Sequence, residues 1–259
     1  MLGDYEKFKK NIYAMTQIDL NCYKEKQMRR RIDTLITKNK CGTYDAYVDV
    51  IKSDKEKFEQ FVNFLTINVS EFYRNPEQWK LLDREIIPEL IQKFGKNLKI
   101  WSAACSTGDE PYSLVMAFSK HLPLNQIKIL ATDIDKQVIA SAKVGLYNEK
   151  SIAGVPDEFK KKFFTKVGNS YQISNEIKSR VEFKEHNLLK DTYPTGCHLI
   201  VCRNVLIYFT EEAKDDIYQK FNHALVKDGV LFIGSTEQIM NYKEINYNRK
   251  SSFFFSREN

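Results

Sequence analysis

The sequence lacks any long apolar run. No uninterrupted apolar stretch reaches the roughly 18 residues that a membrane-spanning helix needs. Its first ten residues, MLGDYEKFKK, carry acids and lysines where a secretory signal would carry an apolar stretch. We therefore expect a cytoplasmic protein that is not inserted in a membrane.

Cysteine and histidine are scarce and scattered. The five cysteines are odd in number and include no CxxC pair, which supports neither a disulfide framework nor a zinc knuckle. The four histidines include no pair at metal-ligand spacing. We expect reduced thiols and no bound metal.

Charge of one sign is concentrated in a single stretch. The net charge of +6, from 40 basic and 34 acidic residues, is mild and is compatible with solubility alone. Between Cys22 and Lys40, however, seven basic residues face two acids, and Arg29, Arg30 and Arg31 are consecutive. A solvated basic face is one interpretation and a nucleic-acid surface another, but aromatics do not interleave with these arginines as in a stacking surface.

The first 65 or so residues show no convincing strand. Apolar residues recur there at helical spacing, as in Tyr5, Phe8, Ile12 and Met15, and turn-forming segments divide the pattern into about four short helices. A further helix runs through Trp79 towards Pro88. We predict an all-α N-terminal domain at residues 1–75 and a linker helix at 76–96.

From Leu98 short apolar runs alternate with helical stretches. This β-α-β-α rhythm is typical of a parallel sheet covered by helices on both faces, here with at least five strands. The resulting α/β domain spans 97–259. A small β subdomain is inserted at about 152–182, with a hairpin around GNS. The tail SSFFFSR is predicted to be an antiparallel edge strand.

Glycine is sparse in the loop after the first predicted strand, AACSTGDEP. A dinucleotide site uses several glycines, as in GxGxxG, so that backbone amides can approach a pyrophosphate. This loop has only Gly108, and Asp109 and Glu110 after it would repel a phosphate. The loop therefore favours a nucleoside ligand without phosphates.

Asp133 ends the second predicted strand, where a carboxylate can accept hydrogen bonds from both ribose hydroxyls of a nucleoside. Nicotinamide and S-adenosylmethionine sites share such an acid, and a helix N-cap is the alternative role, for which Asp135 is better placed. Together with the glycine-poor loop, Asp133 favours S-adenosylmethionine. Methyl transfer to a glutamate needs no general base, because that acceptor, with a reference pKa of about 4.3, is already ionised.

Four motifs then occur in order: TINVSEFYRNP, WSAACSTGDEPYS, ATDID and CRNVLIYF. Together they resemble the chemotaxis receptor methyltransferase (CheR) family over nearly the whole chain. The resemblance implies a Rossmann-like class I S-adenosylmethionine-dependent methyltransferase sheet with an all-α N-terminal domain and a small inserted β subdomain. It also implies the activity: methylation of glutamate side chains on chemoreceptors, which yields methyl esters and S-adenosylhomocysteine and serves sensory adaptation.

The resemblance also implies roles for residues in the matching motifs. Arg74 and Tyr208 would act at the transferred methyl group and the acceptor. The cofactor would be bound by Asn68, Ser70, Arg74, Glu110, Asp133, Asn187, Leu188, Cys202, Arg203 and Asn204.

Some of these roles have structural alternatives. Asn68 and Ser70 could cap a helix, Glu110 could be a solvated acid at a helix start, Tyr208 could be a core aromatic, and Cys202 is favoured as a buried thiol that contributes only its backbone. The family commonly has two glutamates where this chain has Asp109 and Glu110. The changed position is the first, so the role of Glu110 is little affected.

Partners follow from the same resemblance. Receptor helices of this family are acid-rich, so Arg29, Arg30 and Arg31 would dock them by complementary charge. Some relatives hold a receptor tail peptide on the β subdomain, but the hairpin FTKVGNSYQIS lacks a long glycine-rich turn, and we expect no such tether. A nucleic-acid methyltransferase and a regulatory module without turnover are the competing hypotheses.

Overall fold

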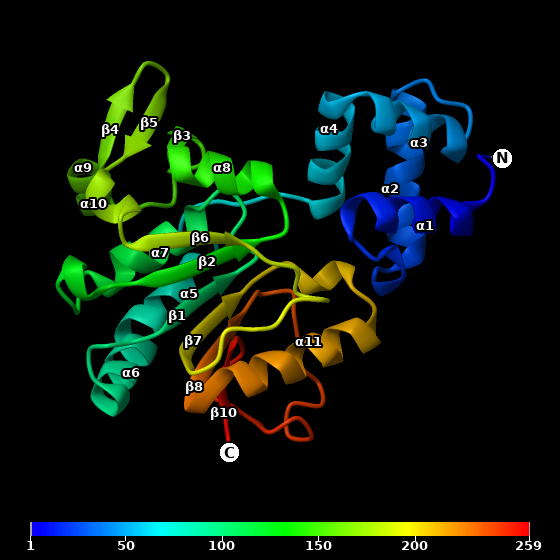
Figure 1. Cartoon of the computed structure of the whole chain (residues 1–259). Coiled ribbons are helices and arrows are strands. Elements are labelled where there is room, and N and C mark those ends of the chain that lie inside the picture. Colours follow the sequence, from blue (N-terminus) through cyan, green and yellow to red (C-terminus); the bar gives the residue numbers. More distant parts are fainter. Residues whose placement is uncertain (1, 259) are drawn as a thin grey trace. The chain divides into compact units, whose positions relative to one another are not determined.

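The computed structural model describes residues 2–258 and divides the chain into two compact units (Figure 1). A helical unit comprises Met1–Ile67 and Leu206–Asp216, and a sheet unit comprises Asn68–Val205 and Ile217–Asn259. The division falls after Ile67, earlier than the boundary at residue 75 that the sequence suggested. The reason is that Phe72 packs edge-on against Tyr147 and Phe164, with ring centroids 4.8 and 5.4 Å away, inside the sheet unit.

The helical unit contains four α-helices, as the apolar spacing predicts. They are α1 (Tyr5–Thr16), α2 (Glu25–Lys38), α3 (Tyr44–Ser53) and α4 (Lys55–Thr66), with a 3-10 turn η1 (Leu20–Cys22) between the first two. The side chains of Asp4, Thr43 and Asp54 accept hydrogen bonds from the first turns of α1, α3 and α4, which satisfies backbone N–H groups that a helix leaves unpaired.

A second chain segment completes the helical unit. The 3-10 turn η4 (Leu206–Tyr208) and the start of α11 (Glu211–Ala224) bond to the chain around Cys22. The carbonyl of Tyr208 accepts from the Lys24 N–H at 2.9 Å, and Thr210 N–H donates to the Cys22 carbonyl at 2.8 Å. These bonds explain why a segment distant in sequence belongs to this unit.

The sheet unit contains seven strands in the order β6-β2-β1-β7-β8-β10-β9. The first five strands are parallel to one another, which confirms the expected parallel sheet, and β10 is antiparallel to both β8 and β9. The strands are β1 (Ile100–Ala103), β2 (Ile129–Asp133), β6 (Val181–Glu185), β7 (Cys197–Cys202), β8 (Leu225–Ile233), β9 (Tyr247–Arg249) and β10 (Phe254–Arg257).

The predicted position of the tail strand at the sheet edge is wrong. Phe255 of β10 pairs with Arg249, so that β9 forms the edge instead. The sequence gives little sign of this strand, because β9 is three residues long and only Tyr247 in it is buried. A short strand with one inward side chain has too few positions to show a period of two.

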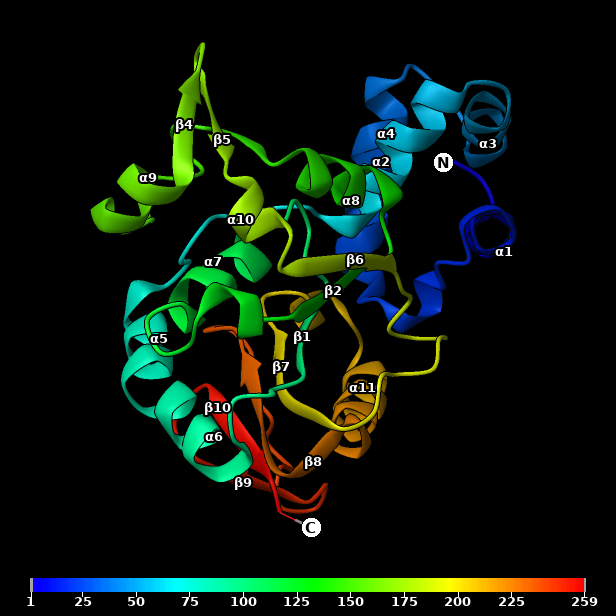
Figure 2. The same ribbon diagram turned by 60° about the vertical axis from the view of Figure 1, so that its left-hand side comes forward.

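Helices cover both faces of the sheet (Figures 1 and 2). On one side lie α5 (Pro76–Leu81), the π-helical segment η2 (Leu82–Ile86), α6 (Ile87–Phe94) and α7 (Asp109–Phe118), and on the other lies the C-terminal part of α11. The sheet unit also contains α8 (Lys136–Val144) and the 3-10 turn η3 (Leu124–Gln126). The helix expected at 76–96 therefore forms part of this unit.

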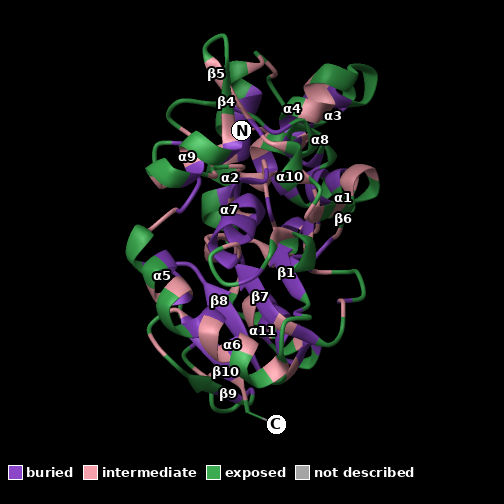
Figure 3. Cartoon of the chain, turned by 90° about the vertical axis from the view of Figure 1, so that its left-hand side faces the viewer, coloured by how far each residue is buried: buried purple, intermediate pink, exposed green. Residues whose placement is uncertain are grey.

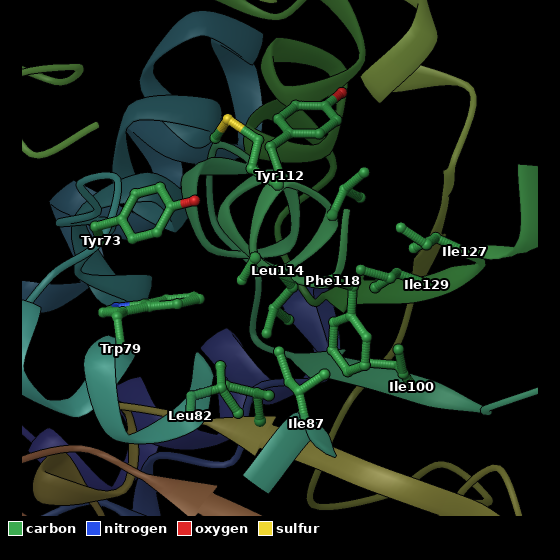
Figure 4. Close-up of a cluster of buried hydrophobic side chains, with 14 of the residues drawn as sticks. Tyr73, Trp79, Leu82, Ile87, Ile100, Tyr112, Leu114, Phe118, Ile127 and Ile129 are labelled. Atoms are coloured by element: carbon green, nitrogen blue, oxygen red, sulfur yellow. The ribbon is translucent and has the colours of Figure 1, made fainter. Parts of the chain in front are cut away.

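Alternate residues of β1 point to the two faces. Ile100 belongs to the cluster that contains Trp79, Ile87 and Phe118 (Figure 4). Trp101 packs edge-on against Phe221 of α11 on the other face, with ring centroids 5.4 Å apart. Both residues are almost fully buried, and Figure 3 shows that most of β1, β7 and β8 is buried. Burial on both faces explains why these strands are continuous apolar runs.

A three-stranded antiparallel sheet, β3-β5-β4, forms the small subdomain. Its strands are β3 (Leu146–Asn148), β4 (Phe164–Val167) and β5 (Ser170–Ile173), and it carries the short helices α9 (Asp157–Phe163) and α10 (Asn175–Lys178). The β4–β5 hairpin is the one predicted around GNS. The subdomain begins earlier than the predicted residue 152, because β3 pairs with β5.

Candidate functional site

The site is built where neighbouring parallel strands of the sheet unit end. Strand β1 lies between β2 and β7, so the loops that follow these three strands share one edge of the sheet. In sheets of this kind ligands bind at that edge. All ten predicted cofactor-binding residues belong to the sheet unit.

Backbone strain is concentrated in these loops. Of the ten described non-glycine residues with positive φ, five lie in the loops after β1 and β7 or in the segment before α5: Tyr73, Asn75, Ala104, Ser106 and Asn204. Such conformations cost free energy and persist only where surrounding contacts enforce them. These segments are therefore held in shape by the rest of the unit.

Gly108 shows how tightly the loop after β1 is packed. Its φ is +89°, and a Cβ added there would lie 2.9 Å from Cβ of Ala142 and 3.2 Å from the hydroxyl of Tyr147. That hydroxyl donates to the carbonyl of Thr107 at 2.7 Å. A side chain at position 108 would displace these neighbours, so the one glycine of the loop is required by close approach as well as by φ.

Asp133 organises the same loop from the end of β2. One carboxylate oxygen accepts from the backbone N–H of Ser106 at 2.8 Å and the other from the N–H of Asp135 at 3.0 Å. Burial raises the pKa of Asp133 to about 6, although these N–H groups oppose the rise. Asp133 is therefore a structural acceptor in addition to its predicted role at the ribose.

Asp135, as expected, is the N-cap of α8, because its side chain accepts from the N–H groups of Gln137 and Val138. The side-chain amide of Asn68 donates to the same carboxylate at 2.9 Å. Asn68 does not cap a helix, since Asn75 is the N-cap of α5. The capping alternative for Asn68 and Ser70 therefore does not hold.

Ser70 and Thr107 both bond to Asp109, the first residue of α7. Burial raises the pKa of this carboxyl group, and the hydrogen bonds from Thr107 and Ser70 oppose the rise. The Thr107 hydroxyl lies 2.5 Å from the carboxylate. Asp109 thus ties the segment before α5 to the loop after β1.

Glu110 lies inside the site. Its side chain is only 14% exposed, accepts from the Ser102 hydroxyl at 2.9 Å and lies 3.7 Å from Arg203. Burial raises the pKa of Glu110 to about 7, and Arg203 and Ser102 oppose the rise. The alternative of a solvated acid at a helix start is therefore excluded.

Arg203, directly after β7, clamps the segment around α5. Its Nη2 donates to the carbonyl of Arg74 at 2.7 Å and to the side-chain oxygens of Gln78 and Asn75 at 2.7 and 3.2 Å. The guanidinium carbon also lies 4.6 Å from the ring centre of Phe232. This side chain is 2% exposed, and its hydrogen bonds fix the position of residues 74–78.

The remaining predicted residues lie on the same unit. Arg74 is half-buried, and its Nη1 donates to the Val69 carbonyl at 3.3 Å. Leu188 is buried, and the neighbouring Asn187 accepts from the N–H of Leu189 at 2.9 Å. Cys202 is fully buried, and burial raises the pKa of its thiol well above the usual value, which fits a contribution through the backbone alone.

Tyr208 and the three arginines belong to the helical unit. Arg29 donates to the Tyr44 hydroxyl at 3.3 Å, and Arg31 donates to the Phe64 carbonyl at 2.8 Å. Arg30 is exposed, and no side chain in residues 2–258 pairs with its guanidinium. Two of the three predicted docking arginines thus also stabilise their own unit.

Sequence reasoning missed three residues that hold the site: Ser102, Gln78 and Glu237. Glu237 accepts from the backbone N–H groups of Asn204, Val205 and Gly234 at 2.7 to 2.9 Å. No sequence signal distinguishes this acid from other loop glutamates.

Within the described part of the chain, no group of three or more histidine, cysteine or acidic side chains could hold a metal. None of the helices there is long and apolar enough to cross a membrane.

Comparison with known proteins covers both units. Residues 68–255 match the family model of the CheR methyltransferase SAM-binding domain, and residues 3–66 match that of the CheR methyltransferase all-alpha domain. A chemotaxis protein methyltransferase of Listeria innocua is 39% identical over 252 residues, which cover 97% of this chain and 96% of the relative. One of Borreliella burgdorferi is 30% identical over 251 residues, covering 92% and 89%. Among solved structures, the DszA carbon methyltransferase is 14% identical, with a TM-score of 0.40. The alignment covers 61% of this chain and 35% of the DszA chain.

Proposed function

Because the chain belongs to the CheR methyltransferase family, we propose that it transfers the methyl group of S-adenosylmethionine to glutamate side chains of chemotaxis receptors. Its class, an S-adenosylmethionine-dependent methyltransferase of chemotaxis, rests on the two family matches. The acceptor is argued from the chemistry of the site. The observation that carries the proposal is the buried Glu110–Arg203 pair beside a loop too poor in glycine for a pyrophosphate.

The residues present fit a nucleoside sulfonium. Ser106 Oγ and Asn204 Oδ1 are buried and have no hydrogen-bond partner among the described residues, and buried polar atoms of this kind are satisfied in the presence of a ligand. The carboxylates of Glu110 and Asp133 would face its positive charge and its ribose hydroxyls. When bound, S-adenosylmethionine supplies a methyl group activated by the positive sulfur.

The acceptor proposal rests on proton accounting. A glutamate side chain in water has a pKa of about 4.3 and is already the nucleophile at neutral pH, so no residue has to remove a proton. The protein has to orient the carboxylate and exclude water, which is catalysis by proximity. Arg74, a half-buried residue just before α5, is assigned to the acceptor, and Tyr208 to the transferred methyl group.

The other proposed features concern partners and place. Arg30, with Arg29 and Arg31, would attract the acid-rich receptor helix by charge. The protein would methylate receptors without binding a receptor tail peptide on the β4–β5 hairpin. The protein would act in the cytoplasm.

The direct test is transfer of label from S-adenosylmethionine with a labelled methyl group to purified receptor. We expect receptor-bound label that is released by mild base, because a carboxyl ester hydrolyses under conditions in which a methylated amine does not. An Arg74→Ala variant should lose most of this transfer, whereas the exposed Arg84→Ala on η2 serves as its matched control.

Two outcomes would contradict the proposal. Base-stable label on the receptor would mean that the acceptor is not a carboxylate. Label on RNA or DNA in preference to receptor would instead favour the nucleic-acid methyltransferase.

A further inference from the structure

Glu237, in the turn after β8, is a buried acid. The residue is 4% exposed. One carboxylate oxygen accepts from the backbone N–H groups of Gly234 at 2.7 Å and Asn204 at 2.9 Å, and the other accepts from Val205 N–H at 2.9 Å. Hydrogen bonds to a carboxylate are strong, and three of them fix the position of this group and of the amides around it.

The amides that Glu237 holds belong to a strained turn. Asn204 has φ +60°, in the left-handed region that non-glycine residues rarely adopt. The turn follows Arg203 directly, and after Val205 the chain leaves the sheet unit at Leu206. The three bonds to Glu237 offset the cost of the backbone conformation at this point.

Gly234 makes this approach possible. A Cβ at position 234 would lie 2.6 Å from the Asn204 nitrogen and 2.8 Å from the Glu237 carboxylate. Contacts this short do not occur for real Cβ atoms, so a side chain would push the turn and the acid apart. The glycine and the acid therefore act on the same turn from two positions of one loop.

We propose that Glu237 is a positioning residue that fixes the Arg203–Val205 turn, so that Arg203 reaches Arg74 and Gln78 while the side chain of Asn204 faces the cofactor. Glu237 acts through these residues without touching the reacting atoms. This inference rests on the proposed function, because it assigns to the turn a place in the cofactor site.

The test is Glu237→Gln in the full chain, with the exposed Glu244→Gln of the same loop as control. The glutamine side chain has a single acceptor oxygen, so it cannot accept from Val205 N–H as well as from the N–H groups of Gly234 and Asn204. We expect hydrogen exchange at the amides of Asn204, Val205 or Gly234 to become about tenfold faster, and S-adenosylhomocysteine affinity to weaken about tenfold. Exchange in α2 and α3 and all properties of the control should stay as in the wild type.

Gly234→Ala approaches the same turn without removing the carboxylate. It should weaken S-adenosylhomocysteine binding by a similar factor. The double variant Glu237→Gln, Gly234→Ala should weaken binding by less than the product of the two single-variant factors, because both substitutions act on one contact.

Faster exchange throughout the chain in Glu237→Gln would make its role merely structural and overturn the inference. Unchanged protection of the three amides, or affinity within about twofold of wild type, would overturn it as well. A wild-type chain that binds no cofactor would contradict the proposed function, and the three amides would still report whether Glu237 fixes the turn.

Discussion

The loops after β1 and β7 and the basic stretch of α2 both gather charged side chains, but the two regions hold their charges differently. In the loops, Glu110 and Arg203 are 14% and 2% exposed and lie 3.7 Å apart. On α2, Arg30 is exposed, and charge in water is screened within about 10 Å at ordinary ionic strength. Burial makes the loop charges sensitive to each change of partner, whereas the α2 charges should act mainly on the rate of encounter.

Removal of Asp133 is the strongest challenge to the buried region. Asp133→Ala deletes the predicted ribose acceptor and leaves the N–H groups of Ser106 and Asp135 without their carboxylate. We expect S-adenosylhomocysteine affinity, measured by calorimetry, to fall about 100-fold. Glu185→Ala, which removes the exposed carboxylate paired in register with Asp133 on β6, should leave the affinity unchanged. Equal affinity of both variants with wild type would refute the assigned role.

Arg203→Lys tests whether the guanidinium shape matters as well as its charge. A lysine keeps the charge but cannot span Arg74, Asn75 and Gln78, so the free energy of unfolding should fall by about 2 kcal/mol. Denaturant titration measures this change. Arg249→Lys on the exposed edge strand β9 should have no effect, and a loss of stability as small as in that control would show that the clamp is dispensable.

Glu110→Gln tests the buried charge through pH. Without ligand the pKa of Glu110 is raised to about 7 by burial, and a positively charged ligand should favour the ionised form. Binding of S-adenosylmethionine below pH 7 should then release a proton. Wild-type affinity for S-adenosylmethionine should therefore rise with pH up to about 7 and level off above it, with a slope of at most about tenfold per pH unit.

In Glu110→Gln that dependence should flatten and affinity at pH 8 should be about tenfold lower. Calorimetry in two buffers of different ionisation enthalpy counts the proton. The control is Glu176→Gln, an exposed first-turn acid of α10. Wild-type affinity that does not change between pH 5.5 and 8 would contradict the pKa shift.

Arg30→Glu changes the exposed basic stretch of α2 and should have the smallest effect. We expect receptor methylation to slow a few-fold at low salt and to match wild type at high salt, with cofactor affinity unchanged. Lys52→Glu, a charge reversal at an exposed residue of α3, is the control. A change in cofactor affinity, or an effect that does not depend on salt, would remove the basis for electrostatic docking.

Features that depend on neighbouring residues in the sequence could be predicted. The strands β1 and β2 were found because they are buried on both faces and therefore consist of apolar residues. The residue types at the site followed from motifs, and Asp135 was recognised as a cap because capping is local.

Contacts between distant residues gave no such signal. Arg203 and Arg74 are 129 positions apart, and Asn204 and Glu237 are 33 apart. Nothing in either segment alone indicates the other, because such pairs form only when strands with different positions in the chain become neighbours in the sheet. For the same reason the pairing of β3 with β5 was not predicted, whereas β9 was missed because it is too short to show a period of two.

Titration calorimetry of the wild-type chain with S-adenosylhomocysteine at pH 8 tests most directly whether the loops after β1, β2 and β7 hold a nucleoside sulfur ligand. We predict binding at a single site, with an affinity that Asp133→Ala lowers about 100-fold and Arg30→Glu leaves unchanged. Absence of heat with both S-adenosylmethionine and S-adenosylhomocysteine, from a folded chain, would contradict the account.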